Sequence, residues 1–234
     1  EWHGPFDSPA AITGSVALQA GPVAVAGYAV DGGNLRATLA PAGWQIGQLE
    51  LARSGGAVRA TGTLQPPATW TDWSQLGLTA RADFSLPRVQ DVFTGEAPVA
   101  GSVTGNASVT LAAGKVTALS AKAAAAPLTA GGKTFELAEV DVSGSLERLE
   151  IARAHARLTA GNEATVSGTA SLTGAMPFDV RWQAAVGDLP ALGRWMDLGP
   201  DTPLPTSGTV RASGTAAATV DDLKNQRFAR AAGR

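Results

Sequence analysis

The sequence predicts an all-β protein built on an antiparallel sheet, and two observations support this fold class. Apolar and polar residues alternate with a period of two in many segments, which gives each strand one apolar and one polar face. A sheet with one apolar and one wetted face is typically antiparallel. Apolar residues recur at helical spacing in two short segments only, so helices are expected to interrupt the sheet.

The alternation is clearest in five segments that we expect to be strands: 76–86, 101–111, 164–172, 178–186 and 208–220. In the second of these, Val103 and Val109 fall on one face and Thr104 on the other. Breaks in the phase near Ala138 and Ala152 predict bulges. Weaker alternation predicts further strands at 11–20, 22–30, 34–40, 45–53, 57–64, 115–122, 133–146 and 148–160.

Two short helices are expected to interrupt the sheet, near residues 188–198 and 87–94. In the first segment, Asp188 is a typical N-cap and Pro190 suits the first helical turn. Apolar residues then follow at helical spacing. The second segment is a shorter version of the same pattern.

The order of these elements predicts an internal repeat. A strand, a short helix, a linker containing proline and a second strand occupy residues 76–111 and recur at 178–220. Repeats of this kind stack on their neighbours in one direction. We therefore interpret residues 1–234 as one segment of a repeating sheet.

Composition excludes several classes of function. The net charge is −2 and the chain has only four lysines, so the dense positive surface that nucleic acid requires is missing. The absence of cysteine rules out disulfides and thiolate metal sites. The sequence contains no run of about 18 apolar residues, so no transmembrane helix is predicted.

The sequence predicts no catalytic residue, no metal site and no cofactor, and therefore no enzyme. His155 shares its strand phase with Arg153 and Arg157, so we expect it to face solvent. Residues 131–134 imitate the end of a phosphate-binding loop, but Pro127 stands where that motif needs its first glycine. The acidic residues between 136 and 150 are expected on charged solvent faces.

The tryptophans fall mostly near expected strand ends or in the helical segments. We interpret them as caps at the open ends of a thin sheet, with contact to lipid as the alternative. Those concerned are Trp44, Trp70, Trp73, Trp182 and Trp195.

Several strings resemble a known family. QLELAR at 48–53 and VRATGTL at 58–64 read as an apolar strand, a turn and a strand that closes on a G-x-L ending. LEIAR and ATVSGTASL repeat this order at 149–153 and 164–172. With GDLPAL at 187–192 and the glycine-spaced strand that follows, they resemble the recurrent units of the AsmA-like and TamB (translocation and assembly module) family. The resemblance spans roughly residues 11–220.

The resemblance implies an elongated, twisted antiparallel sheet curled into an open hydrophobic groove, in the manner of a β-taco. Proteins of this family are anchored in the inner membrane and cross the periplasm of diderm bacteria. They are proposed to carry phospholipid to the outer membrane, and TamB itself is linked to outer-membrane protein assembly. Phospholipid acyl chains and an outer-membrane assembly protein are the partners implied. Because the family's N-terminal anchor and C-terminal domain are not recognisable, we expect a fragment of the repeating groove.

A long apolar sheet face also requires a cover on physical grounds. Two short helices are too small for a dozen strands, so either the sheet curls on itself or an apolar molecule fills it. A structural β-solenoid and an outer-membrane β-barrel segment, neither of which transports lipid, remain alternatives. The residues expected to line a lipid groove are Leu78, Phe84, Val103, Val109, Leu111, Val166, Leu172, Phe178, Val180 and Val210.

Overall fold

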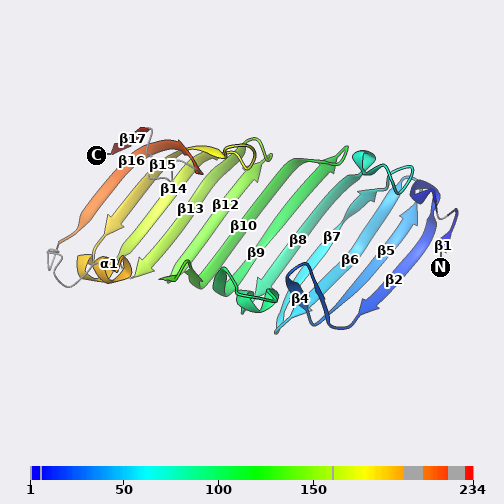
Figure 1. Ribbon diagram of the computed structural model, residues 1–234, viewed down its shortest axis with the longest axis horizontal. Coiled ribbons are helices and arrows are strands. Elements are labelled where there is room, and N and C mark those ends of the chain that lie inside the picture. The colour runs from blue at the N-terminus through cyan, green and yellow to red at the C-terminus, as the bar shows by residue number, and fades with distance from the viewer. Residues whose placement is uncertain (1, 6, 160, 198–207, 221–229, 234) are drawn as a thin grey trace. The chain divides into compact units, whose positions relative to one another are not determined.

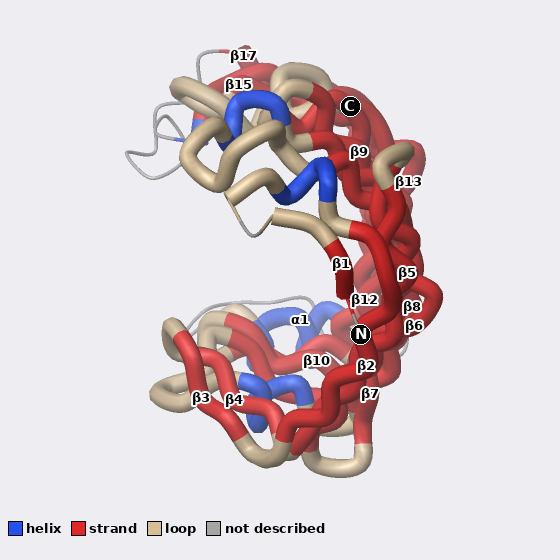
Figure 2. Tube along the Cα trace, turned by 90° about the vertical axis from the view of Figure 1, so that its right-hand side faces the viewer, coloured by secondary structure: helices blue, strands red, loops and turns tan. Residues whose placement is uncertain are grey.

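The computed structural model consists mainly of antiparallel strands joined in a large open sheet (Figure 1). Strands account for 66% of the structure and helices for 9%, which confirms the all-β antiparallel class. The helical segments are short (Figure 2). The structure describes residues 2–5, 7–159, 161–197, 208–220 and 230–233.

The chain divides into two units, Glu1–Ala121 and Lys122–Arg234. From the sequence, residues 1–234 are expected to form one segment, with no boundary at this point. The boundary lies inside a single strand, Lys115–Ala130, so no break in composition marks it. Each unit is described by itself below.

Unit 1 contains an antiparallel sheet and a separate hairpin. Strand order in the sheet is β1-β2-β5-β6-β7-β8-β9-β10, while β3 and β4 pair with each other, and Tyr28 of β4 also forms an isolated bridge with Phe93. The strands are β1 (Trp2–His3), β2 (Thr13–Ala20), β3 (Val23–Val25), β4 (Tyr28–Val30), β5 (Gly32–Ala40), β6 (Gly43–Arg53), β7 (Gly56–Gln65), β8 (Gly77–Leu86), β9 (Val99–Ala112) and β10 (Lys115–Ala130). The 3-10 helices are η1 (Pro9–Ala11), η2 (Trp73–Gln75) and η3 (Val89–Val92).

The register of unit 1 sorts its side chains onto two faces, because residues directly opposite each other in an antiparallel pair share a face. One row across β5 to β9 is apolar: Leu39, Trp44, Leu64, Leu78 and Leu111. The neighbouring row on the other face is polar: Thr38, Gln45, Thr63, Thr79 and Thr110. The alternation of the sequence therefore becomes an apolar face and a polar face.

Unit 2 continues with the same kind of pairing. Its strand order is β10-β12-β13-β14-β15-β16-β17, with β11 paired to β10. The elements are β11 (Lys133–Phe135), β12 (Leu137–Gly144), β13 (Leu149–Thr159), β14 (Asn162–Ala170), β15 (Pro177–Val186), the helix α1 (Leu189–Trp195), β16 (Val210–Thr219) and β17 (Arg230–Gly233). An apolar row again crosses the strands: Val140, Ala154, Val166, Trp182 and Gly214.

Several expectations about the elements are corrected. Segment 22–30 is not one strand but the hairpin β3–β4, because Ala26 and Gly27 both take positive φ and reverse the chain. Segment 133–146 is divided into β11 and β12, and β10 continues eight residues past the expected end at 122. The described residues contain four helical segments rather than two. Of these, η3 and α1 lie within the expected ranges, and η3 is a 3-10 helix.

The bulge expected near Ala152 is present. The register of β13 shifts around Ala152 against both neighbours, β12 and β14. The phase break near Ala138 instead follows the junction between β11 and β12. Each of the two expected repeats, 76–111 and 178–220, contains a strand, a helical segment and a second strand. The linker of the second repeat, at 198–207, lies outside the described residues.

Candidate functional site: half-exposed apolar faces and an apolar hollow

The apolar faces of the two units are poorly covered. Among the described residues few apolar side chains are buried, namely Pro9, Ile12, Leu39, Pro67, Ala125, Leu149 and Ala191. Most side chains of the apolar rows are only half-buried, and Leu18 is 59% exposed. The faces thus remain accessible to an apolar molecule.

Unit 1 contains a hollow of about 380 Å³ on its apolar face. Its nine lining residues are all apolar: Ile12, Val16, Leu35, Ala37, Leu39, Trp44, Ile46, Leu64 and Trp70. They come from β2, β5, β6 and β7 and from the segments that flank β2 and β7. Such a lining favours hydrocarbon and offers no anchor for a charged group.

Aromatic side chains close one end of this hollow. The ring centroids of Trp44 and Trp70 lie 6.0 Å apart with edge-on geometry, and those of Trp70 and Trp73 lie 6.2 Å apart. Edge-on pairs of this spacing stabilise a structure by about 0.5–1.5 kcal/mol beyond their burial. Pro67 is fully buried, and the Ser8 hydroxyl donates to the carbonyl of Ala68 at 3.4 Å. The segment between β7 and β8 is therefore fixed over this end of the apolar face.

Apart from Leu172, the expected groove residues lie on the apolar faces, but none of the ten lines the hollow. Leu78 stands between Leu64 and Leu111, and Val109 lies opposite Ala80. The others of unit 1, Phe84 and Val103, lie opposite Gly105 and Leu86.

In unit 2, Val166, Phe178 and Val180 occupy successive apolar rows of β14 and β15. Val210 lies opposite Val186 at the start of β16 and is exposed. The expected strand 164–172 is corrected at its end, because β14 ends at Ala170. Leu172, which was expected to line the groove, lies exposed in the connection beyond this strand.

Sequence reasoning missed the hollow. Its strands show only weak alternation, and Trp70 lies in a segment without periodicity. The available signal was the apolar phase of Leu35, Ala37 and Leu39, together with Trp44 and Trp70 near strand ends. The interpretation of tryptophans as end caps agrees with the positions of Trp44 and Trp70.

A second set of tryptophan contacts fixes the helix of unit 2. Trp195 at the end of α1 donates from Nε1 to the carbonyl of Thr134 at 2.8 Å and packs edge-on against Phe135. The Lys133 ammonium lies 5.8 Å from the centre of the Trp195 ring and pairs with Asp197. These contacts join α1 to β11.

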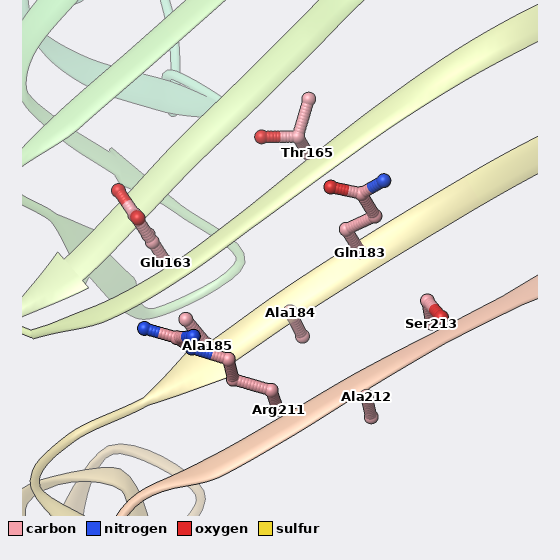
Figure 3. Close-up of a pocket in the computed structure, with 8 residues that line it drawn as sticks. All are labelled: Glu163, Thr165, Gln183, Ala184, Ala185, Arg211, Ala212 and Ser213. Atoms are coloured by element: carbon pink, nitrogen blue, oxygen red, sulfur yellow. The ribbon is translucent and has the colours of Figure 1, made fainter. Parts of the chain in front are cut away.

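The polar face of unit 2 has a hollow of its own, of about 470 Å³ (Figure 3). Glu163, Ala185 and Arg211 form one row of its lining, and Thr165, Gln183 and Ser213 form the next. In the close-up, Arg211 reaches past Ala185 on the side of Glu163 (Figure 3). Acidic, basic and neutral polar groups alternate here, which is typical of a wetted sheet face.

His155 lies on this polar face but is not open to solvent as expected. Its side chain is 10% exposed, with Nδ1 3.2 Å from Glu139 and Nε2 3.2 Å from Glu163. Long neighbouring side chains on the adjacent strands cover the ring. Within the described ranges, no group of three or more His, Asp or Glu side chains is arranged to hold a metal.

The expected acidic solvent face consists of ion pairs. Lys122 pairs with Asp141 at 2.8 Å, and Arg157 pairs with Glu136 at 3.3 Å. Arg153 lies 3.9 Å from Glu139. These carboxylates thus take part in surface pairing between neighbouring strands.

No family model, curated protein or solved structure matches the chain. In the described part of the chain, no helix has the length and apolar character needed to cross a membrane.

Proposed function

We propose that this chain is a non-enzymatic segment of an AsmA/TamB-like cell-envelope protein that shields lipid acyl chains along its apolar sheet faces. The observation that supports the proposal best is the pair of half-exposed apolar faces, one of which contains a hollow lined by apolar residues alone. In this proposal the sheet is an elongated, twisted groove of the β-taco type.

The energetics favour hydrocarbon over a head group as the recognised part of the lipid. Burial of each methylene contributes about 0.8 kcal/mol, so contact with a few methylenes per strand retains a chain. The polar groups of both units are sorted onto the opposite face of each strand. Retention by this face therefore depends on acyl length and little on head-group chemistry.

The biological setting follows from the resemblance of the sequence motifs. In this proposal the parent protein is anchored in the inner membrane of a diderm bacterium and spans the periplasm. It transports phospholipid between the inner and outer membranes and supports outer-membrane biogenesis, with an outer-membrane assembly protein as a partner.

Photocrosslinking from matched positions tests the proposal. A photoreactive amino acid is placed on the apolar face at Val109 or Val166 and on the polar face at Thr110 or Thr165, and the adducts are identified by mass spectrometry. Lipid adducts from Val109 and Val166 alone are expected. Adducts from none of the four positions, or equally from all, would instead favour a structural spacer.

A further inference from the structure

We propose that the hollow of unit 1 holds one linear acyl chain end-on, and that Trp70 is the residue that limits the length of the chain it accepts. This inference rests on the proposed function and assigns a specificity-determining residue to one site on the apolar face.

The size of the hollow matches a single chain. A methylene group takes about the volume that one water occupies in the liquid, roughly 30 Å³. The hollow of about 380 Å³ therefore accepts about a dozen methylenes. Two chains of a diacyl lipid would not fit side by side at that length.

The two ends of the hollow differ in cover. At one end, Ile12 is buried and Trp70 packs on Trp44. Toward the other end, Leu35 lies opposite Leu18, which is 59% exposed. A chain can thus enter from the open face past Leu18, and its methyl end stops at Trp70.

Trp70 is held firmly enough to act as a wall. Its ring packs between those of Trp44 and Trp73, and its segment is anchored by the buried Pro67. Trp73 belongs to the same aromatic cluster, but it is 55% exposed and does not line the hollow. It therefore provides a matched control.

Calorimetric titration with single-chain lysophospholipids of 8 to 18 carbons, below their micelle concentrations, tests the inference. For the unaltered chain, the affinity should rise about fourfold per methylene and level off near 12 carbons. Trp70→Ala should move this limit to longer chains, whereas Trp73→Ala should leave it in place. Ala37→Phe, which fills the hollow, should abolish the binding.

Trp70→Leu guards against a folding defect, because it keeps an apolar side chain of smaller volume, and circular dichroism checks both variants. A limit that stays in place in folded Trp70→Leu, or an affinity that rises without levelling off, overturns the role of Trp70 but leaves lipid binding intact. If no chain binds, or if Ala37→Phe binds like the unaltered chain, the hollow is not the site. Crosslinking at Val109 and Val166 then decides separately on the proposed function.

Discussion

Gly168 lies directly opposite Ile151, beside the bulge at Ala152. Unit 1 contains the same arrangement, because Gly62 lies opposite Ile46 next to a register shift in β6. Both glycines lie in strings that follow the same order in the sequence, at 58–64 and 164–172. A bulge bends its strand and increases the local twist, so the two units bend their sheets at corresponding places.

Replacement of either glycine by alanine should destabilise its unit. A Cβ at Gly62 would press on the carbonyl oxygen of Thr79, and one at Gly168 on that of Asp179. Because these contacts are to backbone, the strands must separate, and we expect each substitution to lower the free energy of unfolding by about 2 kcal/mol or more. Urea denaturation measures the loss.

Gly95→Ala is the control for both glycine substitutions, since a Cβ there meets no atom within 4 Å. It should leave the unfolding free energy nearly unchanged. Equal effects at Gly95 and Gly168 would contradict the close approach of the strands.

The faces of the strands could be read from the sequence because alternation is a local property. Thr104 and Val109 reach opposite faces of β9 as their phase requires. The hairpin at Ala26 and Gly27 was missed, since the apolar alternation continues through the turn and hides it. The extension of β10 was missed because its alanine-rich stretch has no polar phase.

The hollow could not be predicted from local patterns, because it depends on contacts between distant segments. Trp70 meets Trp44 across 26 positions of the chain, and Ile12 joins them from before β2. No periodicity encodes such a meeting. The sequence indicated correctly that Trp44 lies near a strand end, but Trp182 is a correction, because it lies mid-strand in β15, opposite Val166 and Gly214. The sequence did not indicate which tryptophans would line a cavity.

Asn162→Ala should loosen the junction between β15 and α1. Asn162 is 1% exposed; its Oδ1 accepts from the amides of Gly187 and Asp188, and its Nδ2 donates to the carbonyl of Asp188. Loss of the side chain leaves these groups without their partner, so we expect a loss of about 2–3 kcal/mol in unfolding free energy. Hydrogen exchange should also accelerate in α1. Gln183→Ala on the exposed face of β15 is the control. An equal loss of unfolding free energy in this variant would contradict the role of Asn162 in joining β15 to α1.

The pair of Asp31 and Arg53 should contribute to stability at neutral pH and fail in acid. A hydrogen bond from the amide of Ser54, followed by one from Arg53, lowers the pKa of Asp31 below its usual value. A lowered folded-state pKa adds stability above the unfolded-state pKa, and this is lost as pH falls through the folded-state pKa. The thermal midpoint of Asp31→Asn should therefore fall less steeply below pH 4 than that of the unaltered chain. If the thermal midpoints of the two proteins fall equally steeply with pH in acid, the Asp31 carboxylate does not contribute to this pH dependence.

A charge on the apolar face should block lipid contact, whereas the same charge one residue away should not. Val109→Asp puts a carboxylate among Ala80 and its apolar neighbours, while Thr110→Asp puts it in the polar row with Thr79. Desolvating an unpaired charge against an acyl chain costs several kcal/mol, so Val109→Asp should reduce lipid retention at least tenfold. Because Val109 is only half-buried, the unfolding free energy should fall far less than lipid affinity. Native mass spectrometry of co-purified lipid together with urea denaturation separates the two effects. Equal lipid retention by the two variants would show that the apolar face of β9 is not in contact with lipid.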